Sequence, residues 1–448
     1  MLGLGDTGLS MARWLARRGA RVRVADSRAE PPHRARLARE VPAAGLECGP
    51  LQARQFEGVD LVAVSPGIDR REPVIAAAAA RGVPMAGDVE LFAQALPRQG
   101  RPQIVAITGT NGKSTVTQMA GDMCARAGRD TVVAGNIGLP VLDALAAIED
   151  GRRPPEVFVL ELSSFQLETT ASLAPDAATV LNVTEDHLDR YRDIEDYAQA
   201  KARIFAGARV QVVNRDDART CGMARPEGQV LSFGLDAPRG GGEWGIERSD
   251  GAEWLAGHGA RIMPAAELPV VGRHNAANAL AALALGHAIG LADAPMAAAL
   301  REFRGLAHRV ERVAEIAGVT WYDDSKGTNV GSTVAALSGM PQPVVLIAGG
   351  DGKGQDFAPL ADVMRGVRAL VLIGRDREQI AAAVAASGVR IERADSLEDA
   401  VHRAQGLALP GDAVLLSPAC ASYDMFANYL HRAETFVAAV RALAGERG

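Results

Sequence analysis

The sequence predicts an α/β protein of three domains that are built on largely parallel sheets. Short apolar segments of strand length alternate along the chain with segments of helical periodicity, which is the pattern of doubly wound sheets. Glycine-rich or polar clusters directly follow several apolar segments, at the edge where parallel sheets bind ligands. With 448 residues, the chain is too long for one hydrophobic core. We expect domains at residues 1–97, 98–303 and 304–448, with a proline-bounded linker at residues 97–102.

The composition excludes several classes of function. The formal net charge of −6 gives no electrostatic attraction for nucleic acid or for an anionic membrane. No apolar run reaches the length of a membrane span, and the N-terminus lacks a signal-peptide pattern. The four cysteines are far apart, which is typical of reduced thiols. We therefore expect a cytoplasmic monomer that binds no nucleic acid and inserts into no membrane.

The N-terminal segment has the pattern of a nucleotide-binding βαβ unit, which predicts a Rossmann-like first domain. Its glycine motif consists of Gly3, Gly5 and Gly8. A helix follows, and then a strand at residues 21–25 that ends at Asp26. A dinucleotide is the default ligand of such a motif. Almost no strand precedes Gly3, so either the first strand is a stub or the natural start lies upstream.

Residues 104–115 predict a phosphate-binding loop in the central domain, which indicates a P-loop ATPase type. An apolar strand runs into a glycine turn, then Lys113 and Ser114, then a helix at residues 116–126. Backbone N–H groups of such a turn face a phosphate, the lysine adds a positive charge, and the hydroxyl can hold Mg²⁺. Ile107 stands where the strict motif has glycine, so an ordinary strand–turn–helix is the alternative.

Three more residues of the central domain are candidates for metal or phosphate contacts. Glu161 ends the apolar strand at residues 157–162, and a buried unpaired carboxylate is costly. A metal or phosphate-site ligand is one interpretation, and a salt-bridged structural glutamate is the other. His187 is either a ligand or a loop or core histidine. Lys201 lies on an amphipathic helix at residues 194–205, where a solvated lysine is the alternative.

The scarcity of lysine marks four positions. Of 48 basic residues only four are lysines, namely Lys113, Lys201, Lys326 and Lys353. A codon bias that favours arginine explains the many arginines. Under such a bias, a lysine indicates a site where a guanidinium group cannot replace the amine. The lysine amine can lose its proton and react, whereas arginine stays charged.

Polar clusters at strand ends mark the remaining candidates. Ser65-Pro66-Gly67 follows a strand at residues 61–64, with a plain turn as the alternative. Asn275 and Asn278 share a face at a helix start, as ligand contacts or as helix caps.

The third domain is also predicted to be Rossmann-like, with strands at residues 320–323, 344–348, 369–373 and 414–416. The clusters that follow three of these strands are residues 324–329, 349–353 and 417–422, and the second of them could be only a turn.

Taken together, these motifs resemble the ATP-dependent Mur ligases of peptidoglycan synthesis, over nearly the whole chain. The shared motifs are Thr-Gly-Thr-Asn-Gly-Lys-Ser-Thr at residues 108–115, Gly-Asn-Ile-Gly at 135–138, Asp-His at 186–187, His-Asn-x-x-Asn at 274–278, His-Arg at 308–309 and Asp-Ser-Lys-x-Thr-Asn at 324–329. Residues 161–167, 182–187, 349–353 and 416–422 are most similar to the members that add D-glutamate. The chain departs from the family at its short first strand, and at Tyr423 and Tyr429, where the family more often has leucine and phenylalanine.

The resemblance implies amide formation through an acyl phosphate, with UDP-N-acetylmuramoyl-L-alanine and D-glutamate as small-molecule substrates and ATP with two Mg²⁺ ions as cofactors. The implied catalytic residues are Lys113, His187, Lys201, Lys326 and Lys353. The implied ATP-binding residues are Gly109, Thr110, Asn111, Gly112, Lys113, Ser114, Thr115, Asn278, Arg309 and Asp324. The implied metal ligands are Ser114, Glu161, His187 and Lys201, the last as a carbamylated lysine.

The resemblance also implies which residues bind the two other substrates. It implies that the N-terminal glycine motif binds UDP and not a dinucleotide. The implied UDP-substrate residues are Asp6, Thr7, Asp26, Ser27, Arg28, Ser65, Gly67 and Asn136. The implied D-glutamate residues are Thr328, Lys353, Ser422 and Tyr423. Two alternatives remain open: another ligase on the same fold, either a Mur ligase for a different amino acid or a folylpolyglutamate-type synthetase, and a non-catalytic nucleotide-binding scaffold.

Overall fold

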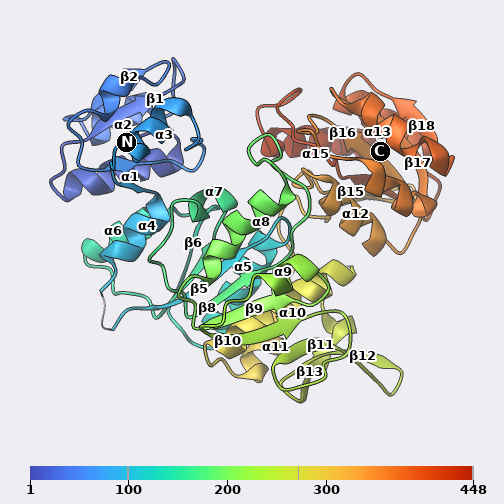
Figure 1. Cartoon of the computed structure of the whole chain (residues 1–448). Helices are drawn as coiled ribbons and strands as arrows, with labels where there is room; N and C mark the ends of the chain where they lie inside the picture. Colours follow the sequence, from blue (N-terminus) through green and yellow to red (C-terminus); the bar gives the residue numbers. More distant parts are fainter. Residues whose placement is uncertain (98–99, 271, 446–448) are drawn as a thin grey trace.

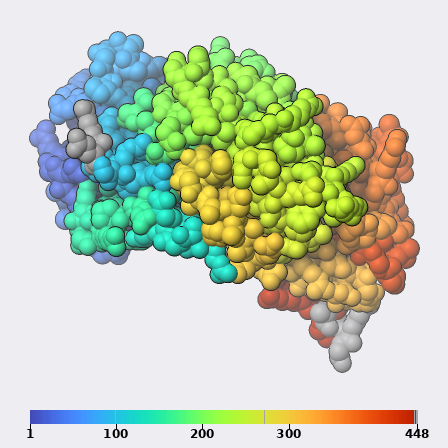
Figure 2. Space-filling model, turned by 90° about the horizontal axis from the view of Figure 1, so that it is seen from below, coloured from blue at the N-terminus to red at the C-terminus, as the bar shows by residue number. Residues whose placement is uncertain are grey.

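The computed structural model describes residues 1–97, 100–270 and 272–445, which form three bodies joined along the chain (Figure 1). The strands form a nine-stranded sheet, a six-stranded sheet and two two-stranded sheets. Figure 2 shows the N-terminal and C-terminal parts at opposite ends, with the central part between them. The predicted α/β class is confirmed.

The N-terminal body is a small parallel sheet with helices around it. Its elements are α1 (Asp6–Arg17), β1 (Arg23–Asp26), α2 (Arg34–Glu40), β2 (Gly45–Cys48), β3 (Val62–Ala63), α3 (Pro73–Ala80), β4 (Met85–Ala86) and α4 (Asp88–Ala95). Both strand pairs, β1 with β2 and β3 with β4, are parallel.

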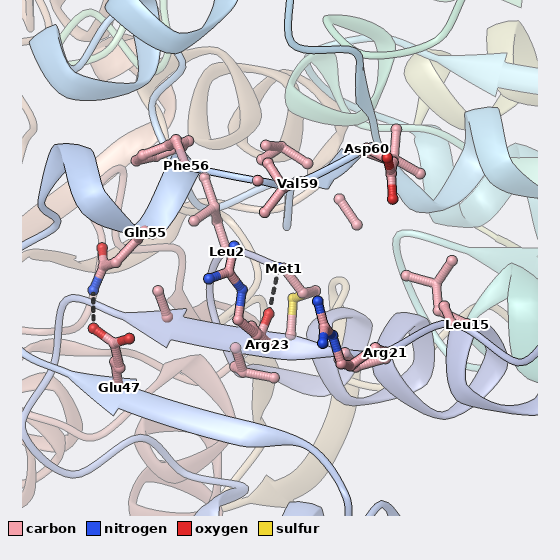
Figure 3. A pocket seen from close by; sticks show the side chains of 18 residues that line it. Met1, Leu2, Leu15, Arg21, Arg23, Glu47, Gln55, Phe56, Val59 and Asp60 are labelled. Atoms are coloured by element: carbon pink, nitrogen blue, oxygen red, sulfur yellow. Dashed lines mark hydrogen bonds between the residues drawn. The ribbon is translucent and has the colours of Figure 1, made fainter.

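The first strand is a stub that joins these two pairs. The amide of Leu2 donates to the carbonyl oxygen of Ala63 at 2.8 Å, and the amide of Gly3 donates to that of Ala25 at 2.8 Å. Beside Met1, a cavity of about 310 Å³ is lined by residues of β1 and β3 and of the segments that precede them (Figure 3). The N-terminal ammonium donates to the carbonyl oxygen of Arg23 at 2.7 Å, and burial lowers its pKa to about 6.

The central body is a nine-stranded sheet in the order β13-β12-β11-β10-β9-β8-β5-β7-β6, in which only β12 runs antiparallel to its two neighbours. Its strands are β5 (Gln103–Thr108), β6 (Thr131–Gly135), β7 (Val157–Glu161), β8 (Ala177–Val180), β9 (Val210–Asn214), β10 (Gln229–Phe233), β11 (Glu243–Ser249), β12 (Ala252–Gly257) and β13 (Ala260–Pro264). Its helices are α5 (Lys113–Arg126), α6 (Val141–Glu149), α7 (Ser164–Leu167), α8 (Ile194–Ala202), α9 (Ala218–Gly222), α10 (Arg273–Ala288) and α11 (Asp293–Glu302).

Two apolar cores cover the two faces of this sheet. One core combines α5, α10 and α11 with the sheet, and α10 is buried along most of its length because it packs against both the sheet and α5. The other core combines α4, α6 and α8, and it also takes up Met11 and Trp14 of α1. The N-terminal body is therefore anchored to the central sheet by apolar side chains as well as by the chain connection.

The C-terminal body is a six-stranded sheet in the order β14-β15-β19-β16-β17-β18, parallel except for the pair β14 and β15. Its strands are β14 (Glu311–Ile316), β15 (Val319–Asp323), β16 (Val344–Gly349), β17 (Val367–Ile373), β18 (Arg390–Arg393) and β19 (Ala413–Leu416). Its helices are α12 (Val330–Gly339), α13 (Arg377–Val384), α14 (Leu397–Leu407) and α15 (Tyr429–Gly445), with α12 and α13 on one face and α14 and α15 on the other.

Some element predictions need correction. The helix predicted from residue 116 begins at Lys113, and the helix predicted to residue 205 ends at Ala202 before a 3₁₀ turn at Arg203–Phe205. The strands β14 and β18 were not predicted. Residues 98 and 99 of the predicted linker lie outside the described residues.

Within the described ranges, no helix combines the length and the apolar character that are needed to cross a bilayer.

Candidate active site

The phosphate-binding loop lies between the carboxyl end of β5 and the start of α5. Gly112 has a φ of 84°, and a Cβ there would lie 2.5 Å from Oδ1 of Asn278, so only glycine fits. The ammonium of Lys113 folds back over the loop and donates to the carbonyl oxygens of Gly109 at 2.9 Å and Thr110 at 2.8 Å. Burial lowers its pKa, although Glu161 opposes that shift. The loop thus concentrates amide groups and one cation at a helix N-terminus, as an anion site requires.

Lys201 reaches the same loop from α8. Its Nζ donates to the carbonyl oxygen of Gly109 at 2.9 Å and lies 4.3 Å from the ring centre of Tyr197. The side chain is only 1% exposed, so the alternative of a solvated lysine is wrong. Burial and the neighbouring Lys113 lower the pKa of Lys201 well below its usual value, which favours the neutral amine.

Two further candidate ligands lie at the end of β7 and after β8, the strands on either side of β5. Glu161 is buried at the end of β7, and its Oε1 accepts a hydrogen bond from Nδ2 of Asn136 at 2.9 Å. His187 follows β8 in a left-handed conformation with a φ of 57°. Burial lowers the pKa of His187 to about 4, because the effect of Asp186 does not compensate for it. The imidazole is therefore neutral at physiological pH, which is the form that binds metals.

The C-terminal body supplies the opposite wall. The guanidinium of Arg309 donates to Oγ of Ser114 at 3.1 Å across the two bodies. Nζ of Lys326 lies 3.6 Å from the ring centre of Tyr429, and burial with Arg309 lowers the pKa of Lys326 to about 8. Burial also raises the pKa of Asp324 to about 7, although its Oδ2 accepts a hydrogen bond from Ser417 at 2.6 Å.

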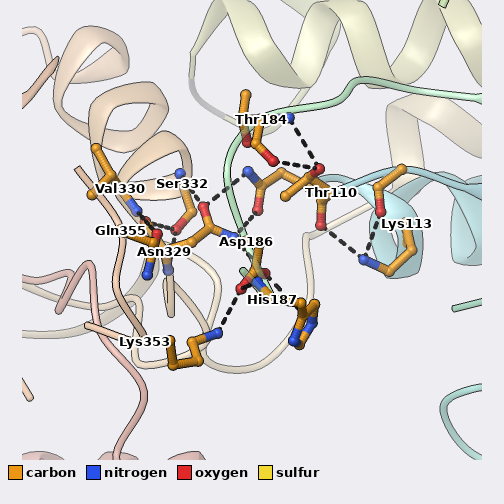
Figure 4. Close-up of polar contacts among 12 residues, drawn as sticks. Thr110, Lys113, Thr184, Asp186, His187, Asn329, Val330, Ser332, Lys353 and Gln355 are labelled. Atoms are coloured by element: carbon orange, nitrogen blue, oxygen red, sulfur yellow. Dashed lines mark hydrogen bonds and ion pairs between the residues drawn. The ribbon is translucent and has the colours of Figure 1, made fainter. Parts of the chain in front are cut away.

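Lys353 connects the C-terminal body to the histidine loop. Its Nζ donates to Oδ1 of Asp186 at 2.6 Å, and Asp186 is buried (Figure 4). Burial alone would raise the pKa of Asp186, but the charges of Lys353, His187 and Lys113 and the hydrogen bond from Lys353 together outweigh it, so the pKa is lowered. The carboxylate and the ammonium therefore form a charged pair between the two bodies.

A cavity of about 570 Å³ lies between these walls, and all four lysines of the chain line it. It also brings together expected site residues from distant segments, namely Asn136, His187, Thr328, Ser422 and Tyr423. The four lysines of the chain therefore border one space, which suits a reaction between anionic substrates.

A second cavity of about 320 Å³ adjoins the phosphate loop and contains the expected ATP residues Asn111, Gly112, Thr115, Asn278, Arg309 and Asp324. Its other walls include Phe233, Leu235 and Phe303, which the sequence analysis did not single out. An apolar wall beside a phosphate site is suited to a nucleoside. No motif marks these residues, because they are ordinary strand and loop hydrophobics in the sequence.

A third cavity of about 410 Å³ lies between α1 and the central body, and it contains the expected substrate residues Asp6, Thr7, Ser65, Gly67 and Asn136. The expected residues Asp26, Ser27 and Arg28 do not line it. Asp26 is buried, accepts from the guanidinium of Arg28 and from the amide of Leu4 at 2.6 Å, and has a pKa lowered to about 2, mainly by Arg28. In this structure Asp26 holds the glycine turn in place.

Sequence reasoning gave no role to two polar residues that the structure places at the centre of the site. In the sequence, Asp186 stands out only as part of the Asp-His motif, and Asn329 only as the last residue of the motif at 324–329. Asn329 bonds to the phosphate loop and caps α12. Both positions belong to motifs of the sequence, but the residues that Asp186 and Asn329 contact lie in distant segments of the chain.

Three family models match successive parts of the chain: "Mur ligase MurD-like, N-terminal domain" at residues 1–87, "Mur ligase middle domain" at residues 107–286 and "Mur ligase, glutamate ligase domain" at residues 308–420. A UDP-N-acetylmuramoylalanine–D-glutamate ligase of Thiobacillus denitrificans is 58% identical, with 100% of this chain and 96% of the relative covered. One from Chromobacterium violaceum is 53% identical, with 100% and 98% covered.

Solved structures share the fold at low identity. The UDP-N-acetylmuramate-alanine ligase MurC of Thermotoga maritima matches with a TM-score of 0.61 and 20% identity, covering 98% of both chains. Folylpolyglutamate synthase of Mycobacterium tuberculosis matches with a TM-score of 0.56 and 19% identity, covering 76% of this chain and 91% of that chain. With full-length relatives above half identity and three matching domain models in order, the chain belongs to the Mur ligase family.

Proposed function

We propose that the chain is an ATP-dependent, ADP-forming ligase that joins D-glutamate to UDP-N-acetylmuramoyl-L-alanine in peptidoglycan precursor synthesis. The full-length relatives named above carry this activity in their names. The single observation in the structure that supports it best is the cavity of about 570 Å³ that all four lysines line. The reaction brings ATP, a carboxylate and an amino diacid together, so it needs clustered positive charge.

The proposed chemistry begins with the carboxylate of UDP-N-acetylmuramoyl-L-alanine, which attacks the γ-phosphorus of ATP. The bond to the bridging oxygen breaks, and ADP and an acyl phosphate form. The amine of D-glutamate, as the free base, then attacks the acyl carbon, and inorganic phosphate leaves as the amide forms. Lys113 and Lys326 offset the charge on the transferred phosphoryl group, and the rigid loop aligns the reacting atoms.

The family uses ATP and Mg²⁺, and the donor atoms of the site suit the metal. Ser114, Glu161 and His187 would hold two Mg²⁺ ions together with a carbamylated Lys201. The buried carboxylate, the neutral imidazole and the neutral amine fit this set, because carbamylation needs an uncharged amine and yields oxygen ligands. The metal, when bound, supplies charge neutralisation between the γ-phosphate and the substrate carboxylate.

The proposal assigns one substrate to each domain. Residues 1–97 bind UDP through the third cavity, residues 98–303 bind ATP, and residues 304–448 bind D-glutamate through Thr328, Lys353, Ser422 and Tyr423, which line the lysine cavity. The enzyme acts as a cytoplasmic monomer, and domain motion brings the C-terminal residues to the ATP.

The test is an assay of phosphate release with ATP, Mg²⁺, UDP-N-acetylmuramoyl-L-alanine and one amino acid at a time. We expect release with D-glutamate and none with L-glutamate, L-alanine or a diamino acid, and the Lys113→Ala variant serves as the inactive control. Release with another amino acid would assign the chain to a different ligase. Nucleotide binding without any substrate-dependent release would identify a scaffold.

A further inference from the structure

The phosphate loop and the C-terminal body touch through a reciprocal pair of amides. Nδ2 of Asn111 donates to Oδ1 of Asn329 at 3.1 Å, and Nδ2 of Asn329 donates to Oδ1 of Asn111 at 3.0 Å. The two residues are 218 positions apart in the sequence. Each amide therefore both donates and accepts, which fixes the orientation of both side chains.

Both ends of this pair are held rigidly. The amide of Asn111 donates to Oδ1 of Asn182 at 2.8 Å, and Nδ2 of Asn182 donates back to the carbonyl oxygen of Asn111 at 3.0 Å. On the other side, Oδ1 of Asn329 also accepts from the amide of Ser332 at 2.9 Å and so caps α12 (Figure 4). A shift of the phosphate loop is therefore transmitted to the start of α12.

A third partner extends the connection to a lysine of the lysine cavity. Nδ2 of Asn329 also donates to Oδ2 of Asp186 at 3.3 Å, while Oδ1 of Asp186 holds Lys353. The segment just before Asn329 carries Lys326 and Thr328, which line the same cavity. The amide pair thus stands between the expected phosphate site and the expected D-glutamate residues.

The contact leaves no room for a further side chain. A Cβ added to Gly331, in the first turn of α12, would lie 2.9 Å from Oγ1 of Thr184 and 3.3 Å from Nδ2 of Asn111. Asn329 is 3% exposed. Because both amides are neutral, they can separate and pair again at lower desolvation cost than two ions.

We propose that the Asn111–Asn329 pair is a latch that couples nucleotide binding at the phosphate loop to the position of the D-glutamate residues. This inference rests on the proposed function and adds two positioning residues to it. Nucleotide fixes Asn111, Asn111 docks Asn329, and Asn329 places Lys326, Thr328 and, through Asp186, Lys353. By linkage, nucleotide and D-glutamate then raise each other's affinity by the same factor.

The test uses three variants. Asn329→Ser keeps a hydroxyl that can cap α12, whereas Asn111→Ser changes a residue that caps no helix. The third variant combines both substitutions. We expect each single variant to raise KM for D-glutamate about tenfold, as loss of about 1.4 kcal/mol of hydrogen bonding would. For Asn329→Ser, which leaves the phosphate loop intact, the dissociation constant of a non-hydrolysable ATP analogue should change by less than about threefold. The double variant should resemble the single ones, because both remove the same contact.

Asn428→Ser is the matched control, since Oδ1 of the exposed Asn428 accepts from the amide of His431 at 2.9 Å at another helix start. It should leave both constants unchanged.

Small-angle scattering with the ATP analogue should show a larger radius of gyration for the latch variants than for the parent. Additive effects, or a parent-like KM and radius, would overturn the latch. Absence of D-glutamate-dependent phosphate release in the parent would instead overturn the proposed function.

Discussion

At the scale of single residues, the surroundings of Lys201 give its amine a chemistry that the guanidinium groups of the many arginines do not have. The amine is buried beside a second lysine, and burial and that charge lower its pKa although Asp186 and Glu161 act in the opposite direction. Guanidinium would remain charged in this position and would have to be buried as a cation. The scarcity of lysine in the sequence pointed to this residue, but its burial could not be predicted from a helix of mixed polarity.

We predict that Lys201→Arg loses most of the activity although it keeps the positive charge. Arginine cannot be carbamylated, so the expected oxygen ligands are lost, and kcat should fall at least about a hundredfold, as loss of about 3 kcal/mol would produce. Phosphate release at saturating substrates measures this. The Lys201→Ala variant should recover part of the rate with added short-chain carboxylates, which can enter the space left by the side chain. Full activity of Lys201→Arg would exclude Lys201 as a ligand.

At the scale of elements, sequence patterns predicted several buried strands, but they missed the buried strand β9 and the polar edge strands of the C-terminal sheet. The strands β7 and β16 are buried along their whole length and appear as apolar runs in the sequence. The edge strands β14 and β18 carry alternating charges instead, and they resemble exposed loops in the sequence. Likewise, the glycine turns and lysines of the site could be predicted, whereas the contact between Asn111 and Asn329 depends on how the bodies dock.

The stub at Met1–Gly3 allows a prediction about stability. An added N-terminal extension of three or four β-branched residues should continue the stub into the cavity of about 310 Å³ beside Met1 (Figure 3). It would add apolar contacts and move the ammonium out of its buried position, which stabilises the N-terminal body by about 2–3 kcal/mol. Differential scanning calorimetry should show a transition that is a few degrees higher.

A glycine–serine extension of equal length is the control for this experiment, because it adds chain without apolar side chains or strand propensity. It should leave the transition close to that of the parent. Equal transition temperatures for the two extended proteins would show that the cavity does not accept a strand.

At the scale of the whole molecule, the central body carries two different interfaces. The C-terminal interface includes polar contacts at and near the phosphate loop, namely Asn111 with Asn329, Ser114 with Arg309, and Asp186 with Lys353. The N-terminal interface combines Met11 and Trp14 with an ion pair, in which the guanidinium of Arg13 donates to both carboxylate oxygens of Asp143 at 2.7 Å. We therefore expect the C-terminal body to move during the reaction while the N-terminal body stays docked.

The final prediction tests the N-terminal interface with Arg13→Met, which keeps most of the side-chain length and removes the charge. Among the described residues, the side chain of Asp143 then keeps only the hydroxyl of Ser10, at 2.6 Å, as a hydrogen-bond partner, and docking should weaken by about 2 kcal/mol. Calorimetry should show the N-terminal body unfolding several degrees earlier, as a separate transition. The control is Arg34→Met, whose partner Glu30 lies in the same body at 3.3 Å with 81% of its side chain exposed. It should leave the profile unchanged, and a single unshifted transition in Arg13→Met would show that Met11 and Trp14 suffice to hold the two bodies together.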